Sequence, residues 1–131
     1  MEITQGASFD TLGLSPAMLR ALNKKGYTES TPIQAGCIPP MLEWKDVTAK
    51  APTGTGKTFA FGIPIIEHID TESDQLQSVI LAPTRELALQ ITSEMRDLAQ
   101  FQPGIRIVCL YGGQPIGKQI DALKKRPQIV V

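Results

Sequence analysis

Ala51-Pro52-Thr53-Gly54-Thr55-Gly56-Lys57-Thr58 is the stretch that decides the fold of this 131-residue chain. Its two glycines allow a tight turn that brings backbone N–H groups close to phosphate oxygens. The apolar run that follows, residues 59–66, predicts a helix whose positive N-terminal end faces the same phosphates. Lys57 then reaches the β- and γ-phosphates, and the Thr58 hydroxyl is placed to bind Mg²⁺. We therefore interpret the stretch as a phosphate-binding loop, with Ala51 where the general pattern has glycine.

The segments on either side of the loop predict strands that alternate with helices. Strands are expected at residues 47–51, 79–82, 105–110 and 128–131. The apolar run at 79–82 is typical of a strand buried on both faces of a parallel sheet. Helical spacing of apolar residues predicts helices at 87–98 and 116–123 between the strands. This alternation predicts an α/β fold with its ligands at the carboxyl ends of the strands.

Proline and hydroxyl residues divide the N-terminal third of the chain into helices. Ser15-Pro16 and Thr31-Pro32 each combine a capping hydroxyl with a proline in the first helical turn. Pro39-Pro40 predicts that the second of these helices breaks or kinks. Pro64 predicts a kink or a restart in the helix after the phosphate loop.

Composition limits the classes of function. Thirteen basic residues balance thirteen acidic ones, so overall charge gives no reason to expect attraction to nucleic acid. No run is long enough to span a membrane, and residues 1–10 lack the apolar core of a signal peptide. Cys37 and Cys109 are too few and too far apart for a zinc site or a disulfide framework. Buried free thiols are the better interpretation, and they indicate a reducing, intracellular compartment.

Four motifs, in order and spacing, resemble the first RecA-like domain of the DEAD-box RNA helicases. The phosphate loop has the helicase form A-x-T-G-x-G-K-T, which accounts for Ala51. Residues 26–34, GYTESTPIQ, are similar to the family's Q motif, and Phe9 lies seventeen residues before Gly26. Residues 83–87, PTREL, match motif Ia, and Gly112-Gly113 matches the GG doublet. The resemblance covers nearly the whole chain.

The resemblance implies an ATP site with Mg²⁺. Lys57 and Thr58 are its catalytic residues, and Thr58 is its metal ligand. Gln34 would pair with the N6 and N7 edge of adenine, Tyr27 would stack on the base, and Phe9 would close the pocket. From the residues alone, a surface glutamine and two core aromatics stay open as alternatives. The full nucleotide-binding set is Phe9, Tyr27, Pro32, Gln34, Ala51, Pro52, Thr53, Gly54, Thr55, Gly56, Lys57 and Thr58.

The resemblance also implies an RNA-binding face, which would contact the sugar-phosphate backbone and be independent of sequence. This face consists of Pro83, Thr84, Arg85, Gly112 and Gly113. Judged without the family pattern, Arg85 and Glu86 are equally well explained as solvated charges in a first helical turn. The basic cluster at residues 124–126 is explained as charge at a helix C-terminus and is not assigned to RNA. His68 is interpreted as a surface or packing residue.

Three features that the resemblance calls for are absent from the sequence: an Asp-Glu-Ala-Asp motif, a Ser-Ala-Thr motif and a second RecA-like domain. We therefore expect part of a longer ATP-dependent RNA helicase, with a Q-motif region at 1–46 and a partial RecA-like domain at 47–131. The parallel sheet, flanked by helices, would be truncated after the start of its fourth strand. The chain alone is expected to bind adenine nucleotide without efficient hydrolysis.

The expected partners are RNA and the second RecA-like domain, without a membrane, in the cytoplasm in preference to the nucleus. Two alternatives to the helicase stay open. The first is a non-catalytic module that binds adenine nucleotide or docks a partner. The second, a small-molecule kinase, is disfavoured by Ala51 and by the Q-motif match.

Overall fold

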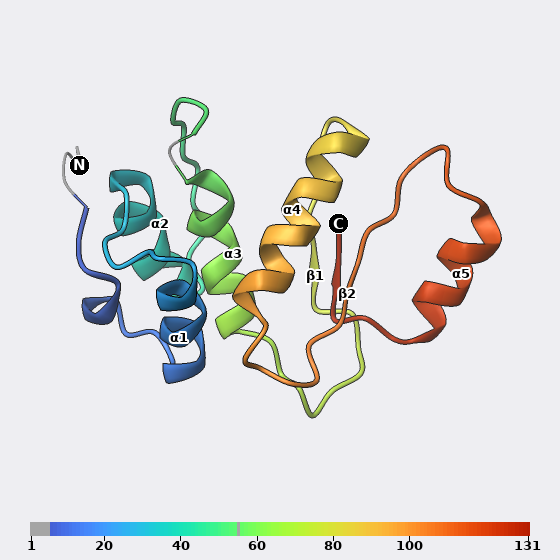
Figure 1. The fold of residues 1–131 in the computed structure, drawn as a ribbon, viewed down its shortest axis with the longest axis horizontal. Helices are drawn as coiled ribbons and strands as arrows, with labels where there is room; N and C mark the ends of the chain where they lie inside the picture. The colour runs from blue at the N-terminus through green and yellow to red at the C-terminus, as the bar shows by residue number, and fades with distance from the viewer. Residues whose placement is uncertain (1–5, 55) are drawn as a thin grey trace.

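The computed structural model describes residues 6–54 and 56–131. Five α-helices, one short 3₁₀ helix and three strands are assigned in these residues (Figure 1). In chain order they are η1 (Phe9–Thr11), α1 (Pro16–Lys24), α2 (Pro32–Leu42), α3 (Lys57–Glu67), β1 (Ser78–Val79), α4 (Arg85–Leu98), β2 (Ile107–Val108), α5 (Ile116–Lys124) and β3 (Ile129–Val130).

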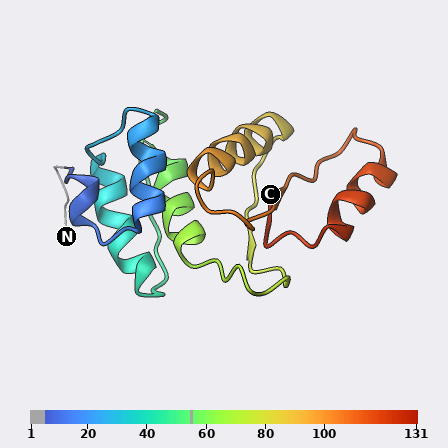
Figure 2. The same ribbon diagram turned by 60° about the horizontal axis from the view of Figure 1, so that its bottom comes forward.

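The three strands form a parallel sheet in the order β1-β3-β2. Ile129 of β3 is in register with Ser78 on one side and with Ile107 on the other. Helix α4 links the two groups of elements, because it contacts α1 and α3 as well as β2. Figure 2 shows α1, α2 and α3 grouped on one side of α4, and α5 on the far side of the strands. The predicted α/β fold with a parallel sheet is confirmed.

The predicted helix starts are confirmed by their caps. The Ser15 hydroxyl accepts a hydrogen bond from the Met18 N–H, and the Thr31 hydroxyl accepts one from the Gln34 N–H. Glu67, at the end of α3, adds a second contact at the start of α1. Its two carboxylate oxygens accept the Ser15 N–H and the Ser15 O–H, each at 2.8 Å. This Glu67 clamp joins the first helix of the chain to the helix after the phosphate loop.

One hydrophobic core runs from η1 to the end of the chain. Its largest fully buried apolar side chains are Met18, Leu22, Ile38, Ile63, Ile66, Met95, Leu98 and Ile129. Helices α3 and α4 pack closely at Gly62, where an added Cβ would lie 2.7 Å from the Met95 sulfur. The core crosses the boundary expected at residues 46 and 47, and the division into two regions stays a prediction. Within the described residues, no helix is both long and apolar enough to span a membrane.

The helix break expected at Pro39-Pro40 and the restart expected at Pro64 are wrong, whereas a kink at these prolines stays a prediction. Helix α2 continues through Pro39 and Pro40, and α3 continues through Pro64. Each proline removes one backbone hydrogen bond, which weakens the helix without ending it. The two helices pack against each other and bury Ile38 and Ile63 completely. This burial offsets the lost hydrogen bonds, because a fully buried aliphatic side chain contributes about 1.5–3 kcal/mol.

The strand expected at residues 47–51 is not formed. Residues 47–50 are exposed, and all three strands of the described sheet lie later in the chain. A strand is stabilised by hydrogen bonds to a neighbour, and this segment has no neighbouring strand in the described residues. The strand expected fourth is therefore the third, β3.

Two apolar surfaces are less buried than expected. The segment at 79–82 is not covered on both faces, since Val79 is 59% exposed and Leu81 is 90% exposed. No residue of α5 is buried either, although Ile116, Ile120 and Leu123 give it an apolar stripe. Helix α4 supplies the cover that the sheet does have, through its contacts with β2.

His68 is a packing residue, as expected. Its ring stacks on Trp44, with 3.7 Å between ring centroids and 7° between ring planes. Its Nε2 lies 3.1 Å from the Leu42 carbonyl oxygen at the end of α2. Trp44 has φ 63°, in the left-handed region that usually favours glycine after a helix. The Trp44–His68 stack therefore joins the C-terminal ends of α2 and α3.

Candidate functional site

The phosphate loop opens into a groove with a volume of about 810 Å³. Residues from the Q-motif region, the loop, α3, the β1 segment and α4 line this groove. Seven of the expected nucleotide-binding residues are among them: Tyr27, Gln34, Thr53, Gly54, Gly56, Lys57 and Thr58. The groove also includes Glu29 and Thr31, which lie inside the Q-motif stretch but were not predicted as site residues. Their position in the sequence between Tyr27 and Gln34 could have indicated that they line the same groove.

The phosphate loop has the backbone that its glycines predict. Gly54 has φ 82° and Gly56 has φ 85°, which are conformations that other residues rarely adopt. Helix α3 begins at Lys57, directly after Gly56. The first N–H groups of a helix lack partners within it, so they are available to phosphate oxygens. Ala51 and Pro52 precede the turn and are not part of the lining, whereas Thr55 falls outside the described residues.

Gln34 connects the Q-motif region to the phosphate loop. Its side chain is buried, and its Oε1 accepts the Thr31 N–H at 2.9 Å. Its Nε2 donates to the Gly56 carbonyl oxygen at 3.1 Å. An amide nitrogen has two donors and an amide oxygen has two lone pairs, so one donor and one acceptor position remain. These are the groups that the N7 and N6 positions of adenine require.

The expected aromatic residues occupy different places. Tyr27 is 48% exposed at the groove and packs edge-to-face on Phe59, with 5.4 Å between ring centroids. Phe9 is buried in the core and is not part of the lining. Its backbone N–H donates to the Thr28 carbonyl oxygen at 3.0 Å, next to Tyr27. Pro32 is the first residue of α2 and also lies outside the lining.

The expected RNA-binding residues come together near the carboxyl ends of β1 and β2. Pro83, Thr84, Arg85, Gly112 and Gly113 are all exposed. Gly113 has φ 93°, and an added Cβ there would lie 3.0 Å from Nη1 of Arg85. The structure therefore places the guanidinium group of motif Ia against the GG doublet. The Thr84 hydroxyl caps α4 by accepting the Leu87 N–H at 3.2 Å.

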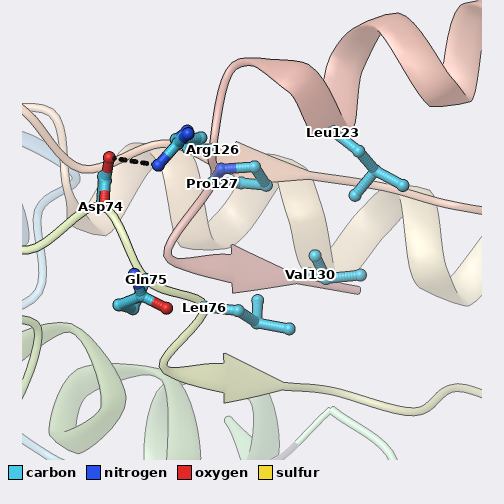
Figure 3. A pocket seen from close by; sticks show the side chains of 7 residues that line it. All are labelled: Asp74, Gln75, Leu76, Leu123, Arg126, Pro127 and Val130. Carbon is cyan, nitrogen blue, oxygen red and sulfur yellow. Dashed lines mark hydrogen bonds and ion pairs between the residues drawn. The ribbon is translucent and has the colours of Figure 1, made fainter.

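Arg126, which follows the end of α5, takes part in a local contact. Arg126 forms an ion pair of 2.9 Å with Asp74, at the edge of a second pocket of about 270 Å³ (Figure 3). Leu76, Leu123 and Val130 form the apolar part of this pocket. None of the expected nucleotide or RNA residues lines it. The absence of an RNA role for residues 124–126 stays a prediction.

The donor groups suit a magnesium ion held mainly by the nucleotide. In the part of the chain that the structure describes, no three His, Cys, Asp or Glu side chains cluster as a metal site. Mg²⁺ in nucleotide sites commonly uses one or two protein oxygens together with substrate phosphates and water. Thr58, in the first turn of α3 and at the groove, provides one such oxygen. Away from the groove, burial raises the pKa of the Cys37 thiol.

Comparison with known proteins shows the family to which the chain belongs. The profile of the DEAD/DEAH box helicase family matches residues 31–131. The ATP-dependent RNA helicase CshA of Limosilactobacillus reuteri is 50% identical over 123 residues, which cover 94% of this chain and 24% of that protein. The DEAD-box ATP-dependent RNA helicase CshA of Bacillus subtilis is 48% identical, covering 95% of this chain and 25% of that protein.

Two crystal structures have the same fold. A DEAD box protein from Methanococcus jannaschii superposes with a TM-score of 0.88 at 40% identity, covering 95% of this chain and 34% of that one. The RNA helicase Prp28 from Chaetomium thermophilum, bound to ADP, gives a TM-score of 0.83 at 38% identity. That match covers 95% of this chain and 31% of the other. The chain thus spans about a quarter of the length of the curated relatives and about a third of these structures.

Proposed function

Because this chain belongs to the DEAD/DEAH box helicase family, we propose that it is the adenine-nucleotide-binding part of an ATP-dependent RNA helicase. The whole protein would couple ATP binding and hydrolysis to unwinding or remodelling of RNA duplexes inside the cell. Its second RecA-like domain would be the partner that completes the active site. The contact between Gln34 and the carbonyl of Gly56 supports the proposal, because it holds the amide that we propose to read the base directly beside the phosphate loop.

Recognition of ATP would divide between the phosphate loop and the Q-motif region, which both line the groove. Lys57 and the N–H groups that begin α3 would bind the β- and γ-phosphates, and Thr58 would hold Mg²⁺. Bound Mg²⁺ would supply positive charge that neutralises the phosphate oxygens. Gln34 would select adenine through its remaining donor and acceptor, and Tyr27 would stack on the base. Guanine carries an acceptor at position 6 where adenine carries a donor, so it would pair poorly with the same amide.

RNA would bind on the face formed by Arg85 and the GG doublet. The guanidinium group suits phosphate oxygens, and the exposed glycines let a nucleic-acid backbone approach closely. Such contacts read the sugar-phosphate backbone and not the bases. The overall charge is zero, so the chain alone would bind RNA weakly, with a Kd of about 10⁻⁴–10⁻⁶ M or higher at physiological salt.

The chain by itself would bind nucleotide without turning it over efficiently. Phosphoryl transfer needs a group that orients the attacking water and positive charge on the transferred phosphoryl group. The Asp-Glu-Ala-Asp motif that serves the first need in this family does not occur in these 131 residues. An arginine finger, which the family places in the second RecA-like domain, is typically worth about 10³–10⁵ in rate.

Calorimetric titration with ADP and GDP tests the proposal. We expect the chain to bind ADP more tightly, because the base contact contributes about 1–3 kcal/mol of discrimination. Lys57→Ala should weaken the binding of both ADP and GDP. Lys118→Ala, at an exposed position of α5, should leave the affinity for both nucleotides unchanged. Equal affinity for ADP and GDP would contradict the adenine site. Binding without any RNA-stimulated hydrolysis in the full-length protein would favour the alternative, a non-catalytic nucleotide-binding or docking module.

A further inference from the structure

Residues 6–9 form a short strap along the segment that precedes α2. Ser8 and Glu29 form an antiparallel bridge. The Phe9 N–H donates to the Thr28 carbonyl at 3.0 Å, and the Ser30 N–H donates to the Ala7 carbonyl at 2.7 Å. The strap therefore holds residues 28–30 by backbone hydrogen bonds at both ends.

The Ser30 side chain also binds the strap, through both backbone polar groups of Ala7. It is 6% exposed, and its Oγ accepts the Ala7 N–H at 2.9 Å while donating to the Ala7 carbonyl at 2.7 Å. Both polar groups of Ala7 are thus bound to one serine. Gly6 lies against the same residue, because an added Cβ at position 6 would collide with the Ser30 carbonyl oxygen. The fit leaves no space for a side chain at position 6.

The strapped segment lies between the two residues proposed to read the base. Tyr27 stands immediately before it, and the capping box of Thr31 and Gln34 begins immediately after it. Glu29, at its centre, lines the groove. A backbone shift at residues 28–30 would move Tyr27 relative to Gln34, and base recognition depends on that geometry. None of the described hydrogen bonds joins residues 6–9 to Gly54 or to residues 56–58 of the phosphate loop, so we expect phosphate binding to be spared.

We propose that Ser30 is a positioning residue for base selectivity, and that it acts by fixing residues 28–30 against the strap. This inference rests on the proposed adenine site. Ser30 is not among the residues that line the groove, so its effect would pass through Tyr27 and Gln34. The consequence is that the N-terminal residues of the chain tune which base the groove accepts.

Two substitutions from opposite sides of the contact test the inference. Ser30→Ala removes the two side-chain hydrogen bonds, and Gly6→Ala forces the strap away from Ser30. The matched control is Gly117→Ala, since an added Cβ on α5 meets nothing within 4 Å. We expect both test variants to reduce the ratio of ADP to GDP affinity by about two- to tenfold, the range that one net hydrogen bond gives. Affinity for pyrophosphate should stay unchanged in all three.

Hydrogen exchange on the unmutated chain gives a second measurement that does not depend on a variant folding. ADP should slow exchange of the amide protons of Ala7, Phe9 and Ser30, and pyrophosphate should not. An unchanged ADP-to-GDP ratio in Ser30→Ala and Gly6→Ala, or equal protection by both ligands, would overturn the positioning role. If the unmutated chain itself failed to prefer ADP, the proposed function would fail instead, so the two outcomes are distinct.

Discussion

Replacement of Gln34 by alanine should cost both folding stability and base selectivity. In the folded chain the side chain accepts the Thr31 N–H at 2.9 Å and donates to the Gly56 carbonyl at 3.1 Å, and only 4% of the residue is exposed. A net contribution of about 0.5–1.5 kcal/mol for each hydrogen bond gives a loss of about 1–3 kcal/mol in the free energy of unfolding. The Thr31 hydroxyl can still accept the backbone N–H of residue 34, so that part of the cap should survive.

The same substitution should remove most of the preference for ADP over GDP. The lost base contact corresponds to about 1–3 kcal/mol of discrimination, whereas pyrophosphate affinity should change little. Urea unfolding measures the change in the free energy of unfolding, and calorimetry measures the affinities for ADP, GDP and pyrophosphate. Gln90→Ala is the matched control, because Gln90 also lines the groove but is exposed on α4. It should leave the urea midpoint and the nucleotide preference close to those of the unmutated chain.

Two results would refute this reasoning in different ways. A lost ADP preference with an unchanged urea midpoint would mean that Gln34 reads the base without holding the phosphate loop. A lowered midpoint with a retained preference would mean that the amide is a packing group and that another residue selects adenine. A Gln34→Glu variant sharpens the test. Its second carboxylate oxygen would face the Gly56 carbonyl oxygen, so we expect it to be at least as destabilised as the alanine variant at neutral pH.

Gly113→Ala should weaken RNA binding in a filter-binding assay at low salt, because position 113 has φ 93° and a Cβ would crowd the neighbouring guanidinium group. Gly117→Ala on α5, where an added Cβ meets nothing within 4 Å, should bind normally, and equal binding by both variants would contradict the proposed RNA face. Glu67→Ala should lower the free energy of unfolding by at most about 3–6 kcal/mol, because it removes two hydrogen bonds between a carboxylate and the start of α1, each worth about 1.5–3 kcal/mol. An unchanged urea midpoint would show that the clamp contributes nothing. Cys37 should react with iodoacetamide more slowly than Cys109 near pH 8, because burial raises the pKa of the Cys37 thiol and blocks access of the reagent to it. Mass spectrometry of the labelled peptides should show this order, and the reverse order would mean that the packing of α2 opens in solution.

Features that depend on nearby residues were predictable from the sequence. The caps of α1 and α2 lie within three residues of the groups they bind, and the phosphate loop needs only its own glycines and the helix that follows. A break of α2 or a restart of α3 at proline was wrongly expected, because the packing that stabilises each of these helices comes from the other one. The segment at 47–51 was misjudged for a related reason, since a strand exists only with a neighbour.

In the candidate site too, features set by nearby residues were predictable and features set by distant residues were not. The Q-motif pattern placed Tyr27 and Gln34 at the groove, but it placed Phe9 there as well, and Phe9 lies in the core. The strap that engages Ser30 joins positions more than twenty residues apart in segments without a strand pattern. No local rule links Ala7 to Ser30. Pairings of this kind become visible only once the chain is folded.

The stack between Trp44 and His68 determines which structural changes in this chain alter its tryptophan fluorescence. Trp44 is the sole tryptophan, so the whole signal comes from the C-terminal ends of α2 and α3. Helix α3 has eleven residues, which puts its C-terminal end about 16 Å from the phosphate loop at its start. The emission should therefore change sharply when the two helices separate and hardly at all when nucleotide enters the groove. Trp44 fluorescence therefore reports whether α2 and α3 are packed together, and it does so independently of nucleotide binding in the groove.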